Sequence, residues 1–159
     1  MTFQTSIQKQ QAPAVEGDFC SANPRASVVT GEGLFVTGAA GVTVGRFAWA
    51  DVNGLVTNAG SGVPTGFIHR EMQAIVTVYL GVSSMVVPPG LIITVMSAGD
   101  FWVRTSTAAT VGQKVFASNT TGQVQTGAAG ATIGGYTETK WFVDSVAAVG
   151  ELVKISTWG

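Results

Sequence analysis

The chain has 159 residues and a formal net charge of −1, and only 11% of its residues are charged, against roughly a quarter in an ordinary soluble domain. One His and one Cys leave few groups for acid–base or nucleophilic chemistry, and the spread of the Lys and Arg residues along the chain argues against nucleic acid as a partner. With 21 Gly and 46% apolar residues, the composition predicts a β-rich protein that works by surface contact.

The lone Cys20 cannot form an intrachain disulfide and has no CxxC partner that would hold zinc. The N-terminus lacks a basic segment followed by an apolar one, and no apolar run reaches the roughly 18 residues of a membrane-spanning helix. We therefore expect synthesis in a reducing cytoplasm and no membrane partner.

The first twelve residues differ in composition from the rest of the chain. They are rich in Gln, contain few large apolar side chains and no turn residues, and are closed by Pro13. This pattern predicts an extended arm over residues 1–12, followed by one domain over residues 13–159, which is long enough to bury a core.

Short apolar or alternating runs, separated by Gly, Asn and Pro, follow the arm. Such spacing predicts a single β-sandwich or jelly-roll-like barrel of about 10 to 12 short strands, with at most one or two helical turns. The runs are Ser27–Val29, Leu34–Thr37, Val42–Ala50, Leu55–Asn58, Gly66–His69, Ala74–Leu80, Leu91–Met96, Phe101–Arg104, Lys114–Ala117, Gln123–Thr126, Trp141–Ala147 and Leu152–Thr157.

The chain echoes itself at an offset of 67 and then 68 residues. Val44-Gly45, Trp49-Ala50 and Gly54-x-Val56 match Val111-Gly112, Phe116-Ala117 and Gly122-x-Val124. Each copy predicts a strand, a polar turn ending in Gly, and a second strand. The pattern fits either a duplication or two hairpins that obey the same rules.

Four aromatic residues are predicted to lie in the core: Trp49 and Phe116 beneath the two hairpins, together with Phe101 and Trp141. Between the runs that end at Val87 and begin at Leu91, the turn Pro88-Pro89-Gly90 predicts a rigid corner.

The densest polar group is His69-Arg70-Glu71, where His69 and Glu71 share one side of an extended chain. No Ser or Cys nucleophile with a recognisable signature accompanies it, so we expect no enzyme activity and interpret the cluster as a hydrogen-bonded corner or subunit contact. The acidic residues are isolated and the Gly-rich stretches lack a nucleotide-binding pattern, so we expect no metal and no cofactor.

Two phrases carry a resemblance to a known family. The segment Gly62–Glu71, GVPTGFIHRE, followed by Ala74–Thr77 and then by Ser97–Val103, SAGDFWV, resembles the structural cement proteins of tailed bacteriophage heads. Val111-Gly112 with Phe116-Ala117 and Gly122-x-Val124 resembles the same family, although many β proteins share such Gly-turn phrases. The likeness covers about residues 13–157.

The resemblance implies a non-enzymatic decoration protein, made in the host cytoplasm, that binds the outside of the major capsid protein shell and bridges neighbouring capsomers. A homo-oligomer, a dimer or a trimer, is the expected form. Expected contact residues lie in the arm and in the polar cluster: Thr2, Phe3, Gln4, Gln8, Lys9, His69, Arg70 and Glu71.

The alternative from another class is a carbohydrate- or receptor-binding β-sandwich adhesion module. It would need exposed aromatic rings among Trp49, Trp102, Trp141 and Trp158.

Overall fold

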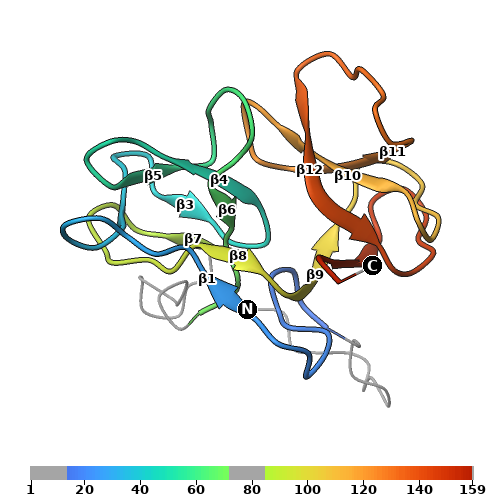
Figure 1. Cartoon of the computed structure of the whole chain (residues 1–159), viewed down its shortest axis with the longest axis horizontal. Helices are drawn as coiled ribbons and strands as arrows, with labels where there is room; N and C mark the ends of the chain where they lie inside the picture. The colour runs from blue at the N-terminus through green and yellow to red at the C-terminus, as the bar shows by residue number, and fades with distance from the viewer. Residues whose placement is uncertain (1–13, 72–84, 159) are drawn as a thin grey trace, which may run out of the picture.

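The computed structural model describes residues 14–71 and 85–158, which form thirteen short β-strands and no helix. Figure 1 shows two lobes, with the early strands on the left and β9 to β13 on the right. We call residues 26–71 together with 85–98 the first lobe, and residues 99–158 the second lobe. The prediction of an all-β, sandwich-like fold is confirmed.

The first lobe holds a six-stranded sheet in the order β1-β8-β6-β4-β5-β2, and a small separate pair, β3 and β7. Its strands are only two to four residues long. They are β1 (Ala26–Ser27), β2 (Val36–Thr37), β3 (Val42–Thr43), β4 (Phe47–Ala50), β5 (Leu55–Thr57), β6 (Gly66–Phe67), β7 (Val86–Val87) and β8 (Met96–Ala98).

The second lobe holds a five-stranded sheet in the order β11-β10-β12-β13-β9. Its strands are four to eight residues long. They are β9 (Asp100–Arg104), β10 (Lys114–Ser118), β11 (Val124–Gly127), β12 (Tyr136–Val143) and β13 (Leu152–Ser156).

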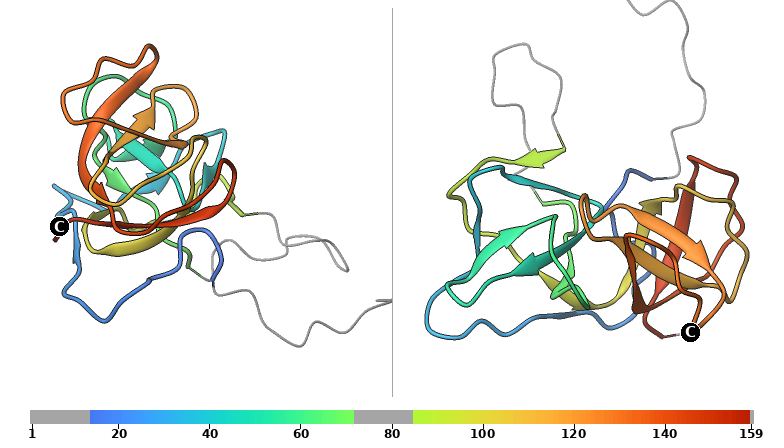
Figure 2. Two further views of the ribbon diagram at one scale, coloured as in Figure 1. Left: turned by 90° about the vertical axis from the view of Figure 1, so that its right-hand side faces the viewer. Right: turned by 90° about the horizontal axis from the view of Figure 1, so that it is seen from above.

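Each sheet curls round until its last strand reaches another part of the same sheet, and Figure 2 shows the two curled lobes from above. In the first lobe, Val36 of β2 pairs with Ile92, on the chain that leads into β8. In the second lobe, Thr105 continues β9 and pairs in parallel with Val124 of β11. Each curled sheet can therefore surround a core of its own.

The two curled sheets have the same topology. The parallel pair Thr37 and Val56 matches the parallel pair Thr105 and Val124, at the same offset of 68 as the later part of the sequence echo. A row of cross-strand partners in the first lobe also has a counterpart: Ser27, Met96, Phe67 and Phe47 match Asp100, Ser156, Phe142 and Lys114.

The two predicted hairpins are confirmed and share one register, since Ala50 pairs with Val56 as Ala117 pairs with Val124. Strand order, register and sequence echo agree, so the lobes are two versions of one fold unit.

Two clusters of buried side chains fill the molecule. Val42, Val44, Ala48, Val56, Ile68, Val87, Ile93 and Val95 form the core of the first lobe, which β3 and β7 help to close. The larger cluster fills the second lobe and takes in Phe47, Trp49, Phe67 and Met96 from the outer face of the first. Because successive residues of a strand face opposite sides, β4 contributes Ala48 to one core and its aromatic neighbours to the other.

The lobes are joined by aromatic packing and by hydrogen bonds. The Phe47 ring lies 5.1 Å from the Trp141 ring, and the Phe67 ring lies 4.6 Å from the Phe101 ring. The Phe47 amide donates a 2.9 Å hydrogen bond to the carbonyl of Gly122, in the β10–β11 turn. The turn of the β10–β11 hairpin is therefore hydrogen-bonded to β4, the first strand of the β4–β5 hairpin.

Several strand boundaries differ from the prediction. The run Val42–Ala50 is two strands, β3 and β4, because Gly45 takes a φ of +74° between them. The run Trp141–Ala147 ends as a strand at Val143, and β12 begins earlier, at Tyr136. The missed start is polar and only partly buried, so it has no apolar run that would reveal it. The predicted strand Ala74–Leu80 and the arm, residues 1–12, lie outside the described residues.

Candidate contact surfaces

The segment Val15–Cys20, which we call the strap, runs along the edge strand β9 of the second lobe. The Gly17 amide donates to the Trp102 carbonyl at 2.7 Å, and the Trp102 amide donates to the Asp18 carbonyl at 2.9 Å. On its other side the Gly17 carbonyl accepts from the Arg70 amide at 2.9 Å. The strap therefore connects β9 to the end of the first lobe at which the polar cluster lies.

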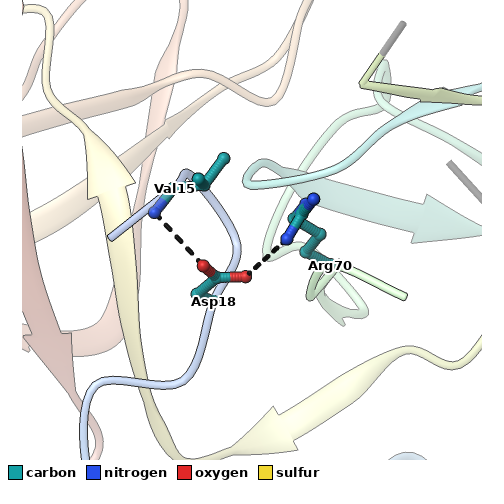
Figure 3. A network of polar contacts seen from close by, with 3 residues as sticks. All are labelled: Val15, Asp18 and Arg70. Atoms are coloured by element: carbon teal, nitrogen blue, oxygen red, sulfur yellow. Dashed lines mark hydrogen bonds and ion pairs between the residues drawn. The ribbon is translucent and has the colours of Figure 1, made fainter. Parts of the chain in front are cut away.

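The predicted polar cluster forms the corner at the strap. Figure 3 shows Asp18 between the Val15 amide and the Arg70 guanidinium, with Asp18 Oδ1 and Arg70 Nη1 3.4 Å apart. His69 Nε2 lies 3.0 Å from Glu71 Oε1, so the two side chains that the sequence placed on one side do meet. This corner is a hydrogen-bonded joint, with Arg70 the most open of its three side chains.

His69 is largely enclosed, and its ring lies 5.1 Å from the ring of Phe19 in the strap. Burial lowers the pKa of His69; the Glu71 carboxylate opposes that effect, and Arg25, which stacks on Phe19, adds to it. The net result is a pKa below the ordinary His value, which favours the neutral ring.

A second joint holds the residues after the strap to the second lobe. The buried Asp100 carboxylate accepts hydrogen bonds from Ser21 Oγ at 2.5 Å and Asn23 Nδ2 at 2.6 Å. Burial raises the pKa of Asp100, and hydrogen bonds from Ser21, Ser156 and Asn23 lower it by more, so that it lies below its ordinary value. Burial and Asp100 together raise the pKa of the Cys20 thiol to about 11, which makes that thiol unreactive.

The four aromatic residues assigned to the core, Trp49, Phe101, Phe116 and Trp141, are all buried. The contact residues assigned to the arm, Thr2, Phe3, Gln4, Gln8 and Lys9, lie outside the described residues. Among the other tryptophans, Trp102 is half-buried, and Trp158 is 54% exposed and donates its indole N–H to the Pro24 carbonyl.

The sequence did not identify the exposed aliphatic side chains as surface residues. Three of them, Leu34, Leu55 and Leu91, are the first residue of a predicted run. At that position the chain is just leaving a turn, and the alternation of buried and exposed side chains has not yet begun. Their place at the start of a run was the sequence signal that could have identified these three residues as exposed. The exposed large apolar residues are Val15, Val29, Leu34, Val52, Leu55, Val63, Leu91, Ile92, Val111, Val146, Val149 and Trp158.

A hollow of about 470 Å³ lies between the segment Thr30–Phe35 and the turn Asp51–Gly54. It contains two carboxylates, Glu32 and Asp51, and no His or Cys. Within residues 14–71 and 85–158, no group of three or more His, Cys, Asp or Glu could hold a metal ion. The same residues contain no helix long and apolar enough to cross a membrane.

Comparisons with known proteins found matches that cover almost the whole chain. A family model described as the XM1 gp53 minor capsid protein matches residues 3–157. A chain solved in "The capsid of Myoviridae Phage XM1" has the same fold, with a TM-score of 0.66 at 19% identity over 99% of this chain and 98% of that chain. No curated protein matches the sequence.

The fold and the family match together define a class, that of structural proteins of tailed-phage capsids, and make the chain a component of the virion. Within that class, the chain belongs to the XM1 gp53 minor capsid protein family. The resemblance to a tailed-phage capsid accessory protein, drawn from the GFIHRE and SAGDFWV phrases, is confirmed.

Proposed function

We propose that this capsid protein is a non-enzymatic decoration, or cement, protein. It binds the outer surface of the major capsid protein shell and stabilises the head by bridging neighbouring capsomers. Residues 13–159 act as one docking body and residues 1–12 as an arm that orders on the shell. Nucleic acid and membrane have no part in this function.

The exposure of large aliphatic side chains carries the proposal. Twelve large apolar residues are exposed, eleven on the two lobes and Val15 in the strap. The described residues contain only two ion pairs between charged side chains, Arg70–Asp18 and Arg104–Glu16, besides the contact of His69 with Glu71. Two of the exposed apolar residues, Leu55 and Ile92, lie side by side across Val36 of β2, and exposed apolar side chains that gather in this way favour burial against a partner. A bridging protein also needs only weak individual contacts, because each further contact within one particle is intramolecular and raises avidity by roughly 10² to 10⁴.

The corner at the strap is the proposed site from which the arm reaches the shell. Arg70 is its most accessible side chain, and the strap beside it begins where the arm ends. An arm that orders only on binding would give up its conformational entropy there and leave the fold of the body unchanged.

The test is binding to purified heads that lack this protein. Deleting residues 2–12 should leave thermal unfolding unchanged and lower occupancy on heads, and Arg70→Ala should lower occupancy by a smaller factor. Lys140→Ala is the control, since Lys140 is an exposed cation on β12 of the second lobe, where its Nζ lies 5.2 Å from the Trp141 ring. Full occupancy of heads by both test variants would show that neither the arm nor the corner contributes to binding. No binding of the intact chain to heads would overturn the function itself.

The glycan-binding alternative retains one supporting observation, the exposed ring of Trp158. Trp49 and Trp141 are buried, and Lys154 lies over the half-buried Trp102, so those three rings offer little stacking surface. Binding to a glycan array that is lost in Trp158→Ala would favour this alternative over the decoration role.

A further inference from the structure

The shared topology of the lobes allows their outward positions to be compared one by one. On the first lobe, Ile92, Val36 and Leu55 are cross-strand partners and point to one side of the sheet, in what we call the apolar row. The matching positions on the second lobe are Leu152, Arg104 and Gln123, which are mostly polar.

The fold therefore does not require aliphatic side chains at these outward positions. Within the apolar row, Leu55 is 44% exposed and Ile92 54%, and the neighbouring Leu34 is 58% exposed. The carboxylates of Glu32 and Asp51 lie beside Leu34 in the adjoining hollow. The surface is thus aliphatic with an acidic border.

The second lobe has a surface of the opposite charge on its outer side. Trp102 pairs with Lys154, and Phe142 pairs with Lys114, so these four side chains lie on one face, which we call the cation face. Lys154 Nζ lies 5.1 Å from the Trp102 ring and Lys114 Nζ 3.5 Å from the Phe142 ring. Neither lysine has an ion-pair partner among the described residues.

Two acidic residues border the cation face, and a third, Asp100, lies in the same row as Phe142 but is buried and hydrogen-bonded to Ser21 and Asn23. Asp144 lies beside Lys154, to whose carbonyl its amide donates, and Glu138 accepts from the Gly130 amide at the far end of β12. Both lie at its margin, and the centre of the face combines aromatic rings with lysines. All four of its side chains remain partly accessible.

We propose that these two surfaces bind each other between copies of this chain. The apolar row of one copy covers the aromatic rings of the cation face on the next copy, while Glu32 and Asp51 approach Lys114 and Lys154. The contact joins different surfaces of the two copies, so it is head-to-tail and closes into a ring if the rotation permits. This proposal extends the bridging role and is testable without any shell.

The experiment is a charge exchange measured by sedimentation velocity on the purified full-length chain. The first variant, Lys114→Glu with Lys154→Glu, reverses the cation face. The second, Glu32→Lys with Val52→Lys, reverses the acidic border and spares Asp51, whose carboxylate accepts from the Asn53 and Leu55 amides and holds their turn. Val52 is fully exposed, so its replacement disturbs no packing. Val63→Lys, at an exposed valine in another loop, is the control.

Wild type and Val63→Lys should self-associate, more weakly at high salt. Each charge variant alone should dissociate at least about tenfold more readily. An equal mixture of the two should recover association, because the reversed face of one then meets the reversed border of the other. The proposal is overturned by a monomeric wild type at every soluble concentration, by association that both charge variants retain, or by a mixture no stronger than its components. Binding of a monomeric wild type to heads would leave the decoration role intact and assign the apolar row to the shell.

Discussion

The two lobes share strand order and register yet differ in what they place on their outer faces. In the first lobe, the row Phe47, Phe67 and Met96 is buried against the second lobe. Its counterpart in the second lobe is Lys114, Phe142 and Ser156, of which Lys114 and Phe142 are partly exposed and Ser156 is buried. The outward residues determine whether the outer face of a lobe packs against the other lobe or stays at the surface of the molecule.

The largest effect should come from exchanging one residue between these rows. Phe47→Lys gives the first lobe the residue of the second, and it buries a charge against Trp141 without a partner. We expect a loss of more than about 4 kcal/mol in the free energy of unfolding. The reverse exchange, Lys114→Phe, should change it by less than about 1 kcal/mol, because that position is partly open. Urea unfolding measures both, and equal losses would contradict the assignment of the rows.

A second test uses the equivalent turn glycines, Gly54 and Gly122, which both have positive φ, +79° and +65°. A Cβ on Gly122 would overlap the Phe47 carbonyl, whereas a Cβ on Gly54 would lie 3.2 Å from the Leu34 carbonyl. We expect Gly122→Ala to cost more than about 3 kcal/mol and Gly54→Ala about 1 to 2 kcal/mol, both measured by urea unfolding.

Gly112→Ala is the control for this pair, with a φ of +87° and no atom within 4 Å of the added Cβ. Its cost reports backbone strain alone. If Gly122→Ala cost no more than Gly112→Ala, the seating of one hairpin on the other would not contribute to stability.

A smaller effect is expected from pH at the joint between the lobes. Burial in the folded state lowers the pKa of His69 below its ordinary value of 6.5. At pH values between these two pKa values the unfolded chain therefore binds more protons than the folded chain. The stability contributed by the neutral ring is therefore present above about pH 6.5 and is lost as the pH falls below it. His69→Gln should flatten the dependence of urea midpoints on pH between about pH 7.5 and about pH 5, a range that brackets the ordinary pKa of His. A dependence that His69→Gln leaves unchanged would assign the titration to another group.

The smallest effect is expected at the exposed ion pair beside the strap. Asp18→Asn removes the charge that faces Arg70 across 3.4 Å and keeps the size of the side chain. Because both partners are partly solvated, the expected loss is about 0.2 to 1 kcal/mol, and less at high salt. A larger loss, measured by thermal unfolding, would show that the strap holds the lobes together more strongly than its hydrogen bonds suggest.

The sequence alone determined the strand-forming class, the two hairpins and the capsid resemblance. Gly54 and Gly122 mark their turns, and the size and setting of Trp49, Phe101, Phe116 and Trp141 assign them to the interior. These are local properties, since positive φ is a demand of the turn itself and a large aromatic ring is most stable out of water.

Only the tertiary structure decided which face of each strand meets which neighbour. Nothing local distinguishes Trp49, which belongs to the cluster shared by the lobes, from Phe116, which lies beside Gly127 of its own lobe and outside that cluster. Likewise Leu55 and Ile92 are ordinary members of apolar runs in the sequence, and the closure of the first sheet through Val36 leaves them outside. An apolar side chain is stabilised by contact with any other apolar surface, so the residue type shows only that burial is favourable. The arrangement of the lobes determines which apolar side chains are buried within this chain and which stay exposed.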